Sequence, residues 1–284
     1  MTMLRVSGLF IYPVKSLRGV AVAEAEVDRY GLAGDRRFMV VDEAGLFMTQ
    51  RGHPRMATVG AALAGGALVL SAEGMTPLRV PRGGDGRAEI RRVTVWKSAD
   101  LAAEDCGEEA AAWLGEALRA RCRLVRIGEG YRRPVGPARA EPGDSVSFAD
   151  GYPLLVATEA SLEDLNRRIE AEGGAAVPMD RFRPGLVVRG ARPYEEDGWR
   201  RIRAGGLVLR GAGPCGRCVV TATDQATGAR GKEPLRTLAG YRRDGRGEVN
   251  FGQNLIHETK SGRIAVGDAV EVAERHPDPA AGGG

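Results

Sequence analysis

The residues most able to do chemistry in this chain are two cysteines three positions apart, Cys215 and Cys218. A redox pair of the thioredoxin type begins a helix, whose N-terminus lowers the pKa of the thiol. Here the β-branched residues 219–221 follow the pair and predict a strand, which disfavours that chemistry. A structural zinc site needs more thiolate or imidazole ligands at similar spacing, but Cys106, Cys122 and the three histidines are scattered. Zinc is therefore also disfavoured.

Two interpretations of the cysteine pair remain. Cys215 can be a small buried residue at the beginning of a strand. Cys218 can supply one thiolate to a single soft metal centre whose other ligands come from a cofactor. The second interpretation requires groups elsewhere that bind the anionic part of such a cofactor. The basic segments 12–16 and 34–37 are candidates, although each by itself is more typical of a protein surface.

Composition and charge limit the partners. The formal net charge is +4, and lysines and arginines are spread along the chain without forming a tract, so small anions are more expected partners than nucleic acid. The 43% hydrophobic and 27% charged content is typical of a soluble globular protein, and no apolar run approaches the ~20 residues that span a bilayer. The N-terminus does not resemble a secretory signal. We therefore expect a cytoplasmic protein without a membrane span, and its four cysteines are too few for a disulfide framework.

The first half of the chain is predicted to be rich in short strands. Valine- and phenylalanine-containing runs punctuated by glycines indicate strands joined by tight turns. A helix is predicted at residues 107–122, where alanine-rich sequence places Trp113, Leu114 and Leu118 toward one face. This pattern predicts a β-barrel-like first domain over residues 1–127. The predicted strands lie within residues 4–14, 21–32, 36–51, 66–72, 76–81 and 91–98.

The second half predicts another barrel with inserted helices. Residues 128–145 concentrate glycine, proline and arginine and predict a linker or a long surface loop. A helix is expected at residues 157–174, with Ser161 and Asp164 spaced for a capping box. The fold class is therefore mainly β with inserted helices, and a second domain covers residues 146–273 before a disordered tail at 274–284. Its strands are predicted within residues 183–190, 206–213, 218–224, 248–256 and 265–274.

Short motifs in both halves together resemble one family. They occur in order over nearly the whole chain, leaving out only the tail. The first three resemble the N-terminal β-barrel domain that accompanies MOSC domains, and the last four resemble the MOSC domain itself. The resemblance is strongest to the MOSC proteins that include the mitochondrial amidoxime-reducing component and its bacterial counterparts. The motifs are residues 12–16, 34–38 and 49–51, followed by 180–184, 214–218, 232–235 and 250–254.

The resemblance implies a molybdenum-pterin cofactor whose metal is bound by Cys218, the catalytic residue. A thiolate is a soft donor that suits such a metal. By the same resemblance Lys15, Ser16 and Arg36 would contact the pterin or its phosphate, and Arg183 would reach it from the second domain. A buried phosphate needs several cationic or N–H partners, which this set supplies.

Further cofactor contacts are implied with alternatives left open. Arg217, beside the metal ligand, is either a contact or an ordinary strand-edge arginine. Thr158 and Ser161 begin a helix, whose free N–H groups favour anions, but capping alone would explain both. Asn250 and Gln253 belong to segment 250–254, which is expected to form a loop over the cofactor. Relatives often have Asn after the Arg-Pro of the 180–184 motif, whereas position 185 is Gly, so one polar contact is expected to be missing.

The implied function is a molybdenum cofactor-dependent oxidoreductase that reduces N-hydroxylated or N-oxide substrates by oxygen-atom transfer to molybdenum. The chain lacks the cysteine set of a fused iron–sulfur domain, so a separate electron donor is expected, such as a ferredoxin, a haem protein or a flavin reductase. No side chain stands out as general acid or base. Two alternatives remain: a sulfur carrier that uses a Cys218 persulfide, and a cofactor-binding protein without turnover.

Overall fold

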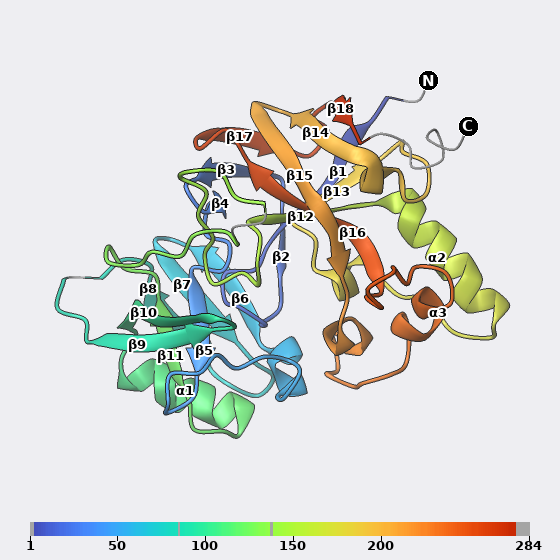
Figure 1. Ribbon diagram of the computed structural model, residues 1–284. Helices are drawn as coiled ribbons and strands as arrows, with labels where there is room; N and C mark the ends of the chain where they lie inside the picture. The colour runs from blue at the N-terminus through green and yellow to red at the C-terminus, as the bar shows by residue number, and fades with distance from the viewer. Residues whose placement is uncertain (1–2, 85, 137–138, 277–284) are drawn as a thin grey trace, which may run out of the picture.

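The computed structural model describes residues 3–84, 86–136 and 139–276 of the 284-residue chain. Strands dominate, helices are few, and the elements gather into two lobes that lie side by side (Figure 1). The expected fold class, mainly β with inserted helices, is confirmed. Among the described residues no helix is both long and apolar enough to cross a membrane.

One lobe, called the C-terminal lobe here, is built on an eight-stranded sheet of order β18-β14-β15-β16-β12-β13-β1-β2. Its neighbouring strands are antiparallel except β12 and β13, which run parallel. In the edge strand β18 each more buried residue is followed by an exposed one, as expected for a strand with one buried face. The strands are β1 (Arg5–Ile11), β2 (Val20–Val22), β12 (Leu154–Thr158), β13 (Leu186–Arg189), β14 (Trp199–Ala204), β15 (Leu207–Gly216), β16 (Asn250–His257) and β18 (Val270–Arg275).

Strand pairing does not follow a division of the chain at residues 128–145. Strand β1 stands at the beginning of the chain, yet it pairs with β13 in the C-terminal lobe. The reason is its apolar face: Val6 and Leu9 are buried in one core together with Leu186 and Trp199. Burial of large apolar side chains is the main stabilising term of such a sheet, so the first strand is part of that lobe's core.

The other lobe, called the N-terminal lobe, holds two small sheets of order β5-β11-β10-β9 and β6-β7-β8. Its predicted helix is confirmed as α1 (Glu108–Leu118). Three strands, β6, β10 and β11, escaped the sequence prediction. The alanine-, aspartate- and glutamate-rich sequences of β6 and β10 have low β propensity. The strands are β5 (Phe38–Val41), β6 (Gly60–Ala64), β7 (Ala67–Ser71), β8 (Leu78–Pro81), β9 (Ile90–Val95), β10 (Ser98–Asp105) and β11 (Arg123–Arg126), and a short helix η1 covers Pro54–Thr58.

A third sheet of order β17-β3-β4 joins sequence from both ends of the chain. It contains β3 (Glu24–Asp28), β4 (Gly31–Leu32) and β17 (Gly262–Ala265). Ile264 of β17 and Val27 of β3 are buried in the same core as β1. Residues near positions 25 and 264 therefore stabilise one structural unit.

The predicted helix at 157–174 is confirmed as α2 (Glu159–Ala171), but its cap differs from the expected one. The N-cap is Thr158, whose hydroxyl accepts a hydrogen bond from the Ser161 backbone N–H at 3.2 Å. Asp164 lies beyond the first turn and pairs with Arg168 at 2.8 Å. The capping box predicted at Ser161 and Asp164 placed the N-cap three residues too late. Thr158 and Ser161 both carry a hydroxyl that suits an N-cap, and local sequence did not separate them.

The predicted strand at 218–224 is wrong. Strand β15 ends at Gly216, and residues Val219–Ala222 form the short 3-10 helix η4. The Thr221 hydroxyl donates to the Cys218 carbonyl at 2.9 Å, a local bond that β-branched sequence does not announce. The remaining helices are η2 (Met179–Phe182), η3 (Glu195–Gly198) and α3 (Leu235–Ala239).

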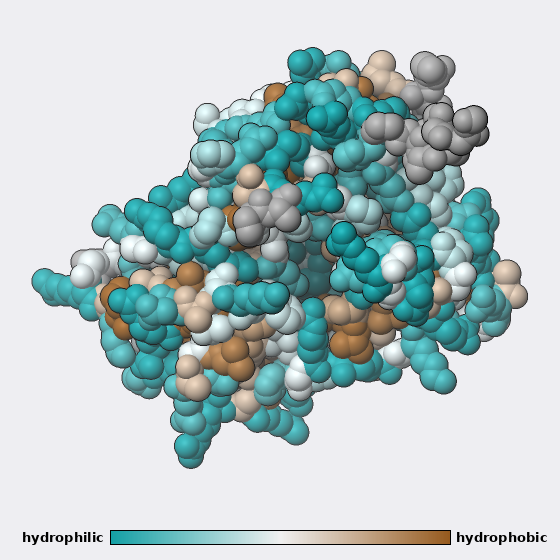
Figure 2. Space-filling model, viewed as in Figure 1, coloured by the Kyte–Doolittle hydropathy of each residue, from teal (hydrophilic) through white to brown (hydrophobic). Residues whose placement is uncertain are grey.

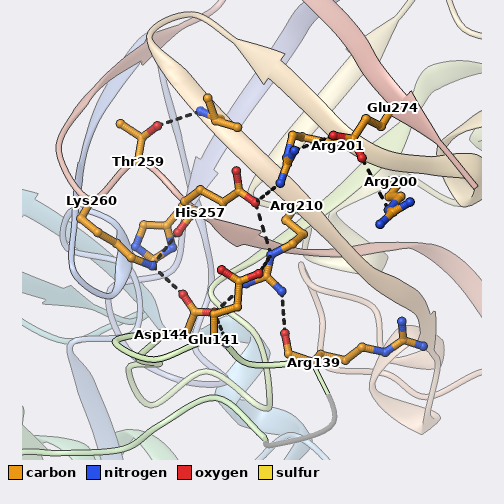
Figure 3. A network of polar contacts seen from close by, with 12 residues as sticks. Arg139, Glu141, Asp144, Arg200, Arg201, Arg210, His257, Thr259, Lys260 and Glu274 are labelled. Carbon is orange, nitrogen blue, oxygen red and sulfur yellow. Dashed lines mark hydrogen bonds and ion pairs between the residues drawn. The ribbon is translucent and has the colours of Figure 1, made fainter.

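The structure also differs from the surface loop expected at 128–145. The described residues of this segment form no helix or strand, but Tyr131 is fully buried and its ring packs edge-on against Tyr30 and Phe148. Asp144 is buried and pairs with Arg210 of β15 and with Lys260, each at 2.7 Å (Figure 3). These contacts bind the segment to the C-terminal lobe. Of the tail predicted at 274–284, residues 277–284 lie outside the described residues.

Candidate functional site

A cavity lies between the two lobes and brings together most of the residues predicted from the motifs. Figure 2 shows a hollow between the lobes on a face that is mainly hydrophilic. The cavity lining combines cationic side chains, two thiols and one carboxylate. Its polar and sulfur-containing members are Lys15, Ser16, Arg36, Arg51, Asp150, Arg183, Cys215, Arg217, Cys218, Thr221 and Asn254.

The N-terminal side of the cavity begins where β1 ends. The Lys15 backbone N–H donates to the Phe38 carbonyl at 2.9 Å, which links this segment to β5. Ser16 has a φ of 66°, a left-handed conformation that is unusual for a residue other than glycine. The Lys15 side chain is buried and forms an ion pair with Asp150. Burial lowers the pKa of Lys15, and the Asp150 carboxylate partly offsets this effect.

Arg36 and Arg183 meet at the buried ring of Tyr12. Their guanidinium carbons lie 4.2 and 4.3 Å from the ring centroid, within the range of cation–π contacts. Both arginines have left-handed backbones, with φ of 49° and 55°. Burial raises the pKa of Tyr12 to about 12, so the ring stays neutral between the two cations. Strained backbone at two cationic residues of one cavity is typical of a functional site.

Arg183 is the least compensated cation of the cavity. Its Nη1 lies 3.3 Å from Gln225 Oε1, whereas its Nη2 is buried without a hydrogen-bond partner among the described residues. Burial and, to a smaller extent, the neighbouring Arg36 lower the pKa of Arg183 to about 10. An unsatisfied buried donor costs about 1–3 kcal/mol, more when it is charged. The residues present therefore fit an anionic group placed against Arg183.

The two thiols lie on the C-terminal side, Cys215 near the end of β15 and Cys218 just beyond it, and each contacts an arginine. Arg51 Nη2 donates to Cys218 Sγ at 3.0 Å, and Arg217 Nη1 donates to Cys215 Sγ at 2.9 Å. Arg217 also donates to the Phe182 carbonyl at 2.6 Å. No group of three or more His, Cys, Asp or Glu side chains that could hold a metal occurs within residues 3–84, 86–136 and 139–276. A metal at this cavity would thus need ligands from a cofactor in addition to thiolate from the chain.

A pair of buried amides joins the lobes beside the cavity. Gln50 and Gln225 exchange hydrogen bonds of 3.0 Å in both directions. Gln50 also donates to the Ser16 carbonyl at 2.9 Å. Both amides are buried, so breaking this contact would leave polar groups unsatisfied. The pair fixes the left-handed Ser16 relative to the C-terminal lobe.

Thr158 and Ser161 do not line the cavity. Both are fully buried, and their hydroxyls donate to Glu196 Oε2 at 3.0 and 2.9 Å. Burial raises the pKa of Glu196, which needs these donors because it is fully buried itself. The structure thus gives the two hydroxyls a role in capping α2 and satisfying a buried carboxyl.

Asn250 and Gln253 lie in strand β16, where the sequence predicted a loop. Asn250 Nδ2 donates to Asp244 Oδ2 at 3.1 Å, and Gln253 Nε2 donates to the Trp199 carbonyl at 2.6 Å. Neither side chain lines the cavity, whereas the adjacent Asn254 does. Successive side chains of a strand point to opposite faces, which explains why one neighbour reaches the cavity and the other the core.

Sequence reasoning missed Arg51 and Asp150. Arg51 ends the 49–51 motif, but that motif gave no sign that its guanidinium would reach Cys218 in the other half of the chain. Asp150 follows the segment expected to be a surface loop. Arg133 positions it by donating to the carbonyls of Ser147 at 2.9 Å and Asp150 at 2.7 Å. Because the burial of Arg133 cannot be read from local sequence, the sequence carried no clear signal for the position of Asp150.

Two family models match the chain in the order that the lobes suggest. The MOSC N-terminal beta barrel domain matches residues 3–121 and the MOSC domain matches residues 143–271. The cavity, whose lining holds two thiols and several cations, takes residues from both matched domains.

Curated relatives narrow the class. Mitochondrial amidoxime-reducing component 1 of mouse is 36% identical over 282 residues, covering 93% of this chain and 81% of the relative. The human component 1 is 35% identical, covering 93% of this chain and 82% of the relative. The human component 2 is 34% identical over 247 residues, covering 84% and 72%. The chain belongs to the amidoxime-reducing component family of MOSC proteins.

This membership decides two of the sequence-based expectations and overturns a third. The expected enzyme class, a molybdenum cofactor-dependent oxidoreductase, and the expected cofactor are both confirmed. The expected cytoplasmic location is wrong, because the relatives are named as mitochondrial components. A secretory signal and an apolar span are features unrelated to import into mitochondria, so their absence from the sequence does not exclude that location.

Proposed function

We propose that this protein reduces N-hydroxylated or N-oxide compounds at the cavity between its lobes, with Cys218 as the catalytic metal ligand. One observation carries the proposal: Cys218 opens on the same cavity as Lys15, Arg36 and Arg183, which come from both lobes. The relatives are named for the reduction of amidoximes, which are N-hydroxylated amidines. The reaction consumes two electrons and two protons and releases the deoxygenated nitrogen compound and water.

The cofactor would be held at two kinds of group. When bound, the molybdenum-pterin cofactor supplies two-electron oxygen-atom-transfer chemistry. The Cys218 thiolate would hold the metal, since soft thiolates suit molybdenum better than the carboxylate in this cavity. The anionic part of the cofactor would be held by Lys15, Ser16, Arg36, Arg183 and Arg217. Of these, Arg183 and Arg217 each have a buried donor without a hydrogen-bond partner among the described residues.

Other cavity residues orient these groups. Arg51 donates to Cys218 Sγ and stacks on Trp96, so the guanidinium limits where the sulfur can lie. Asp150 pairs with Lys15 and fixes the direction of its ammonium group. Preorganised charges of this kind act without reorganisation during turnover.

Electrons would come from a separate donor such as a ferredoxin, a haem protein or a flavin reductase. The described residues hold no cysteine set for an iron–sulfur cluster, since the four cysteines include a Cys106 and a Cys122 that lie away from the cavity. Exposed arginines would favour an acidic donor by electrostatic steering.

The test compares two matched variants, Cys218→Ala and Cys215→Ala, produced in a host that makes the cofactor. We expect Cys218→Ala to lose donor-dependent reduction of an amidoxime to background, and Cys215→Ala to keep measurable turnover. Full activity in Cys218→Ala would contradict the proposal. Wild-type protein that carries labile sulfane sulfur and no molybdenum would favour the sulfur-carrier alternative.

A further inference from the structure

Trp96 has a backbone conformation that is unfavourable for a tryptophan. It begins the two-residue turn between β9 and β10, where Val95 pairs with Ser98, and its φ is 54°. Turns that require a left-handed residue are normally filled by glycine or asparagine, and a bulky residue there is a true outlier. The ring is also 43% exposed, so burial in a core does not explain its presence.

The exposed ring is fixed by contacts to residues of the cavity. Its Nε1 donates to Asp150 Oδ1 at 3.1 Å, and the Arg51 guanidinium carbon lies 4.5 Å from the ring centroid. Asp150 and Arg51 both line the cavity, and Arg51 itself contacts Cys218. Trp96 is therefore one contact away from the thiol, although it stands in the other lobe. Figure 1 shows the β9–β10 hairpin directed toward the C-terminal lobe.

Further apolar surface adjoins the ring. Phe47 lies 4.8 Å from Trp96 between centroids, with the planes tilted by 58°. Leu46 forms an isolated β-bridge with Thr94, which lies two residues before Trp96, and Leu46 is 47% exposed. Few large apolar side chains are as exposed as Leu46 and Trp96 among the described residues. Exposed aromatic surface beside a polar cavity is typical of small-molecule binding sites.

We infer that Trp96, with Phe47, forms the wall that binds the flat apolar body of the substrate beside Cys218. The inference rests on the proposed function and adds a preference for aromatic over small aliphatic N-oxygenated compounds. The occupant is a small molecule because both polar contacts of the ring point to the cavity lining, through Asp150 and Arg51. A substrate whose N–O group enters the cavity would carry its organic body past this ring.

The test uses two amidoximes that differ only in phenyl against methyl, benzamidoxime and acetamidoxime, with the variants Trp96→Ala and Trp96→Phe. Electrons come from reduced methyl viologen, so that docking of a protein donor does not affect the rate. We expect Trp96→Ala to lose about tenfold in kcat/KM for benzamidoxime and less than about twofold for acetamidoxime. Trp96→Phe keeps an aromatic face and should retain most of the benzamidoxime activity. Val266→Ala, which removes exposed apolar surface elsewhere, serves as the control.

A second readout does not need turnover. Benzamidoxime added to the cofactor-loaded protein without reductant should quench tryptophan fluorescence in the wild type, and the quenching should be lost in Trp96→Phe. An equal loss for both amidoximes in Trp96→Ala, or a loss seen only with a protein donor, would overturn the inference. Quenching of Trp96 fluorescence by benzamidoxime, without reduction of either amidoxime, would support the wall and contradict the proposed function.

Discussion

Two charged regions of this protein use similar residues in opposite ways. The first, called the loop network here, links the buried segment before β12 to the C-terminal lobe (Figure 3). Its cations form ion pairs with carboxylates: Arg210 and Lys260 pair with Asp144, and Arg201 pairs with Glu258. The second, called the cavity cluster, is formed by Lys15, Arg36, Arg51, Arg183 and Arg217. In the cluster only Lys15 and Arg36 pair with carboxylates, and the described residues offer no ion pair to the other three.

These two regions show how a binding site differs from a structural network. A buried charge is costly unless it is paired, so a protein that keeps unpaired arginines in a cavity loses stability there. The loop network is neutralised within the chain and needs no ligand. The cavity cluster is completed only by an anion from outside. The balance of charges, rather than the number of arginines, therefore marks the functional region.

The largest expected effect on stability comes from His257, which adjoins the loop network. It is fully buried, its Nε2 lies 2.8 Å from the Asp28 carbonyl, and burial lowers its pKa from 6.5 to about 4. Between these pH values the unfolded chain binds a proton that the folded chain refuses. The free energy of unfolding should therefore fall by about 3 kcal/mol as pH drops from 6.5 to 4.

Urea unfolding at pH 7, 5.5 and 4 would measure this fall in the wild type, in His257→Gln and in His276→Gln, which changes an exposed histidine. The fall should shrink in His257→Gln and persist in His276→Gln. An identical pH dependence in all three proteins would show that His257 titrates normally and would remove this part of the comparison.

Arg183→Met tests the cavity cluster. Removing a buried cation with an unpartnered Nη2 should leave the stability of the cofactor-free protein unchanged or slightly higher. Loss of a charge-assisted contact of about 2 kcal/mol should weaken cofactor binding by about thirtyfold. Molybdenum content after gel filtration and thermal unfolding of cofactor-free protein would measure the two effects. Lower stability with undiminished molybdenum content would show that Arg183 is structural.

Asp144→Asn tests the loop network and should give the reverse result. Removing the negative charge that Arg210 and Lys260 share should lower the free energy of unfolding at pH 7 by about 1–2 kcal/mol. Hydrogen bonding and these cations lower the pKa of Asp144 below 3.8, against the effect of burial. The stabilisation is thus present above pH 3.8 and is lost as pH falls through the lower folded-state value.

The difference in free energy of unfolding between the wild type and Asp144→Asn, measured by urea unfolding, should consequently shrink toward zero under strongly acid conditions. Molybdenum content should be the same in both proteins when each is fully folded. A loss of molybdenum as large as that of Arg183→Met would erase the distinction between the two regions.

Local sequence predicted strands in which buried residues alternate with more exposed ones, such as β9, and both long helices. It failed where tertiary contacts overrode local patterns. The β-branched residues after Cys218 form η4, because Thr221 bonds back to the Cys218 carbonyl. The segment at 128–145 is buried because aromatic packing of Tyr131 outweighs its glycine and proline content. Contacts between segments far apart in sequence leave no local signature.

The candidate site was predicted in part for the same reason. Motifs located Cys218, Lys15, Ser16, Arg36, Arg183 and Arg217, and all of them line one cavity. The polar residues Thr158 and Gln253 suited a cofactor equally well by type, but a buried carboxyl and a backbone carbonyl occupy them. Their partners lie about forty and fifty residues away, so only the fold could reveal that these donors are already used.

The central claim is that Cys218, and not Cys215, supplies the protein ligand to molybdenum. X-ray absorption at the molybdenum edge of the cofactor-loaded wild type, Cys218→Ser and Cys215→Ser tests it directly. The account predicts that Cys218→Ser loses one sulfur neighbour of the metal, while Cys215→Ser keeps the wild-type coordination. An unchanged sulfur shell in Cys218→Ser, or its loss in Cys215→Ser, would contradict the assignment.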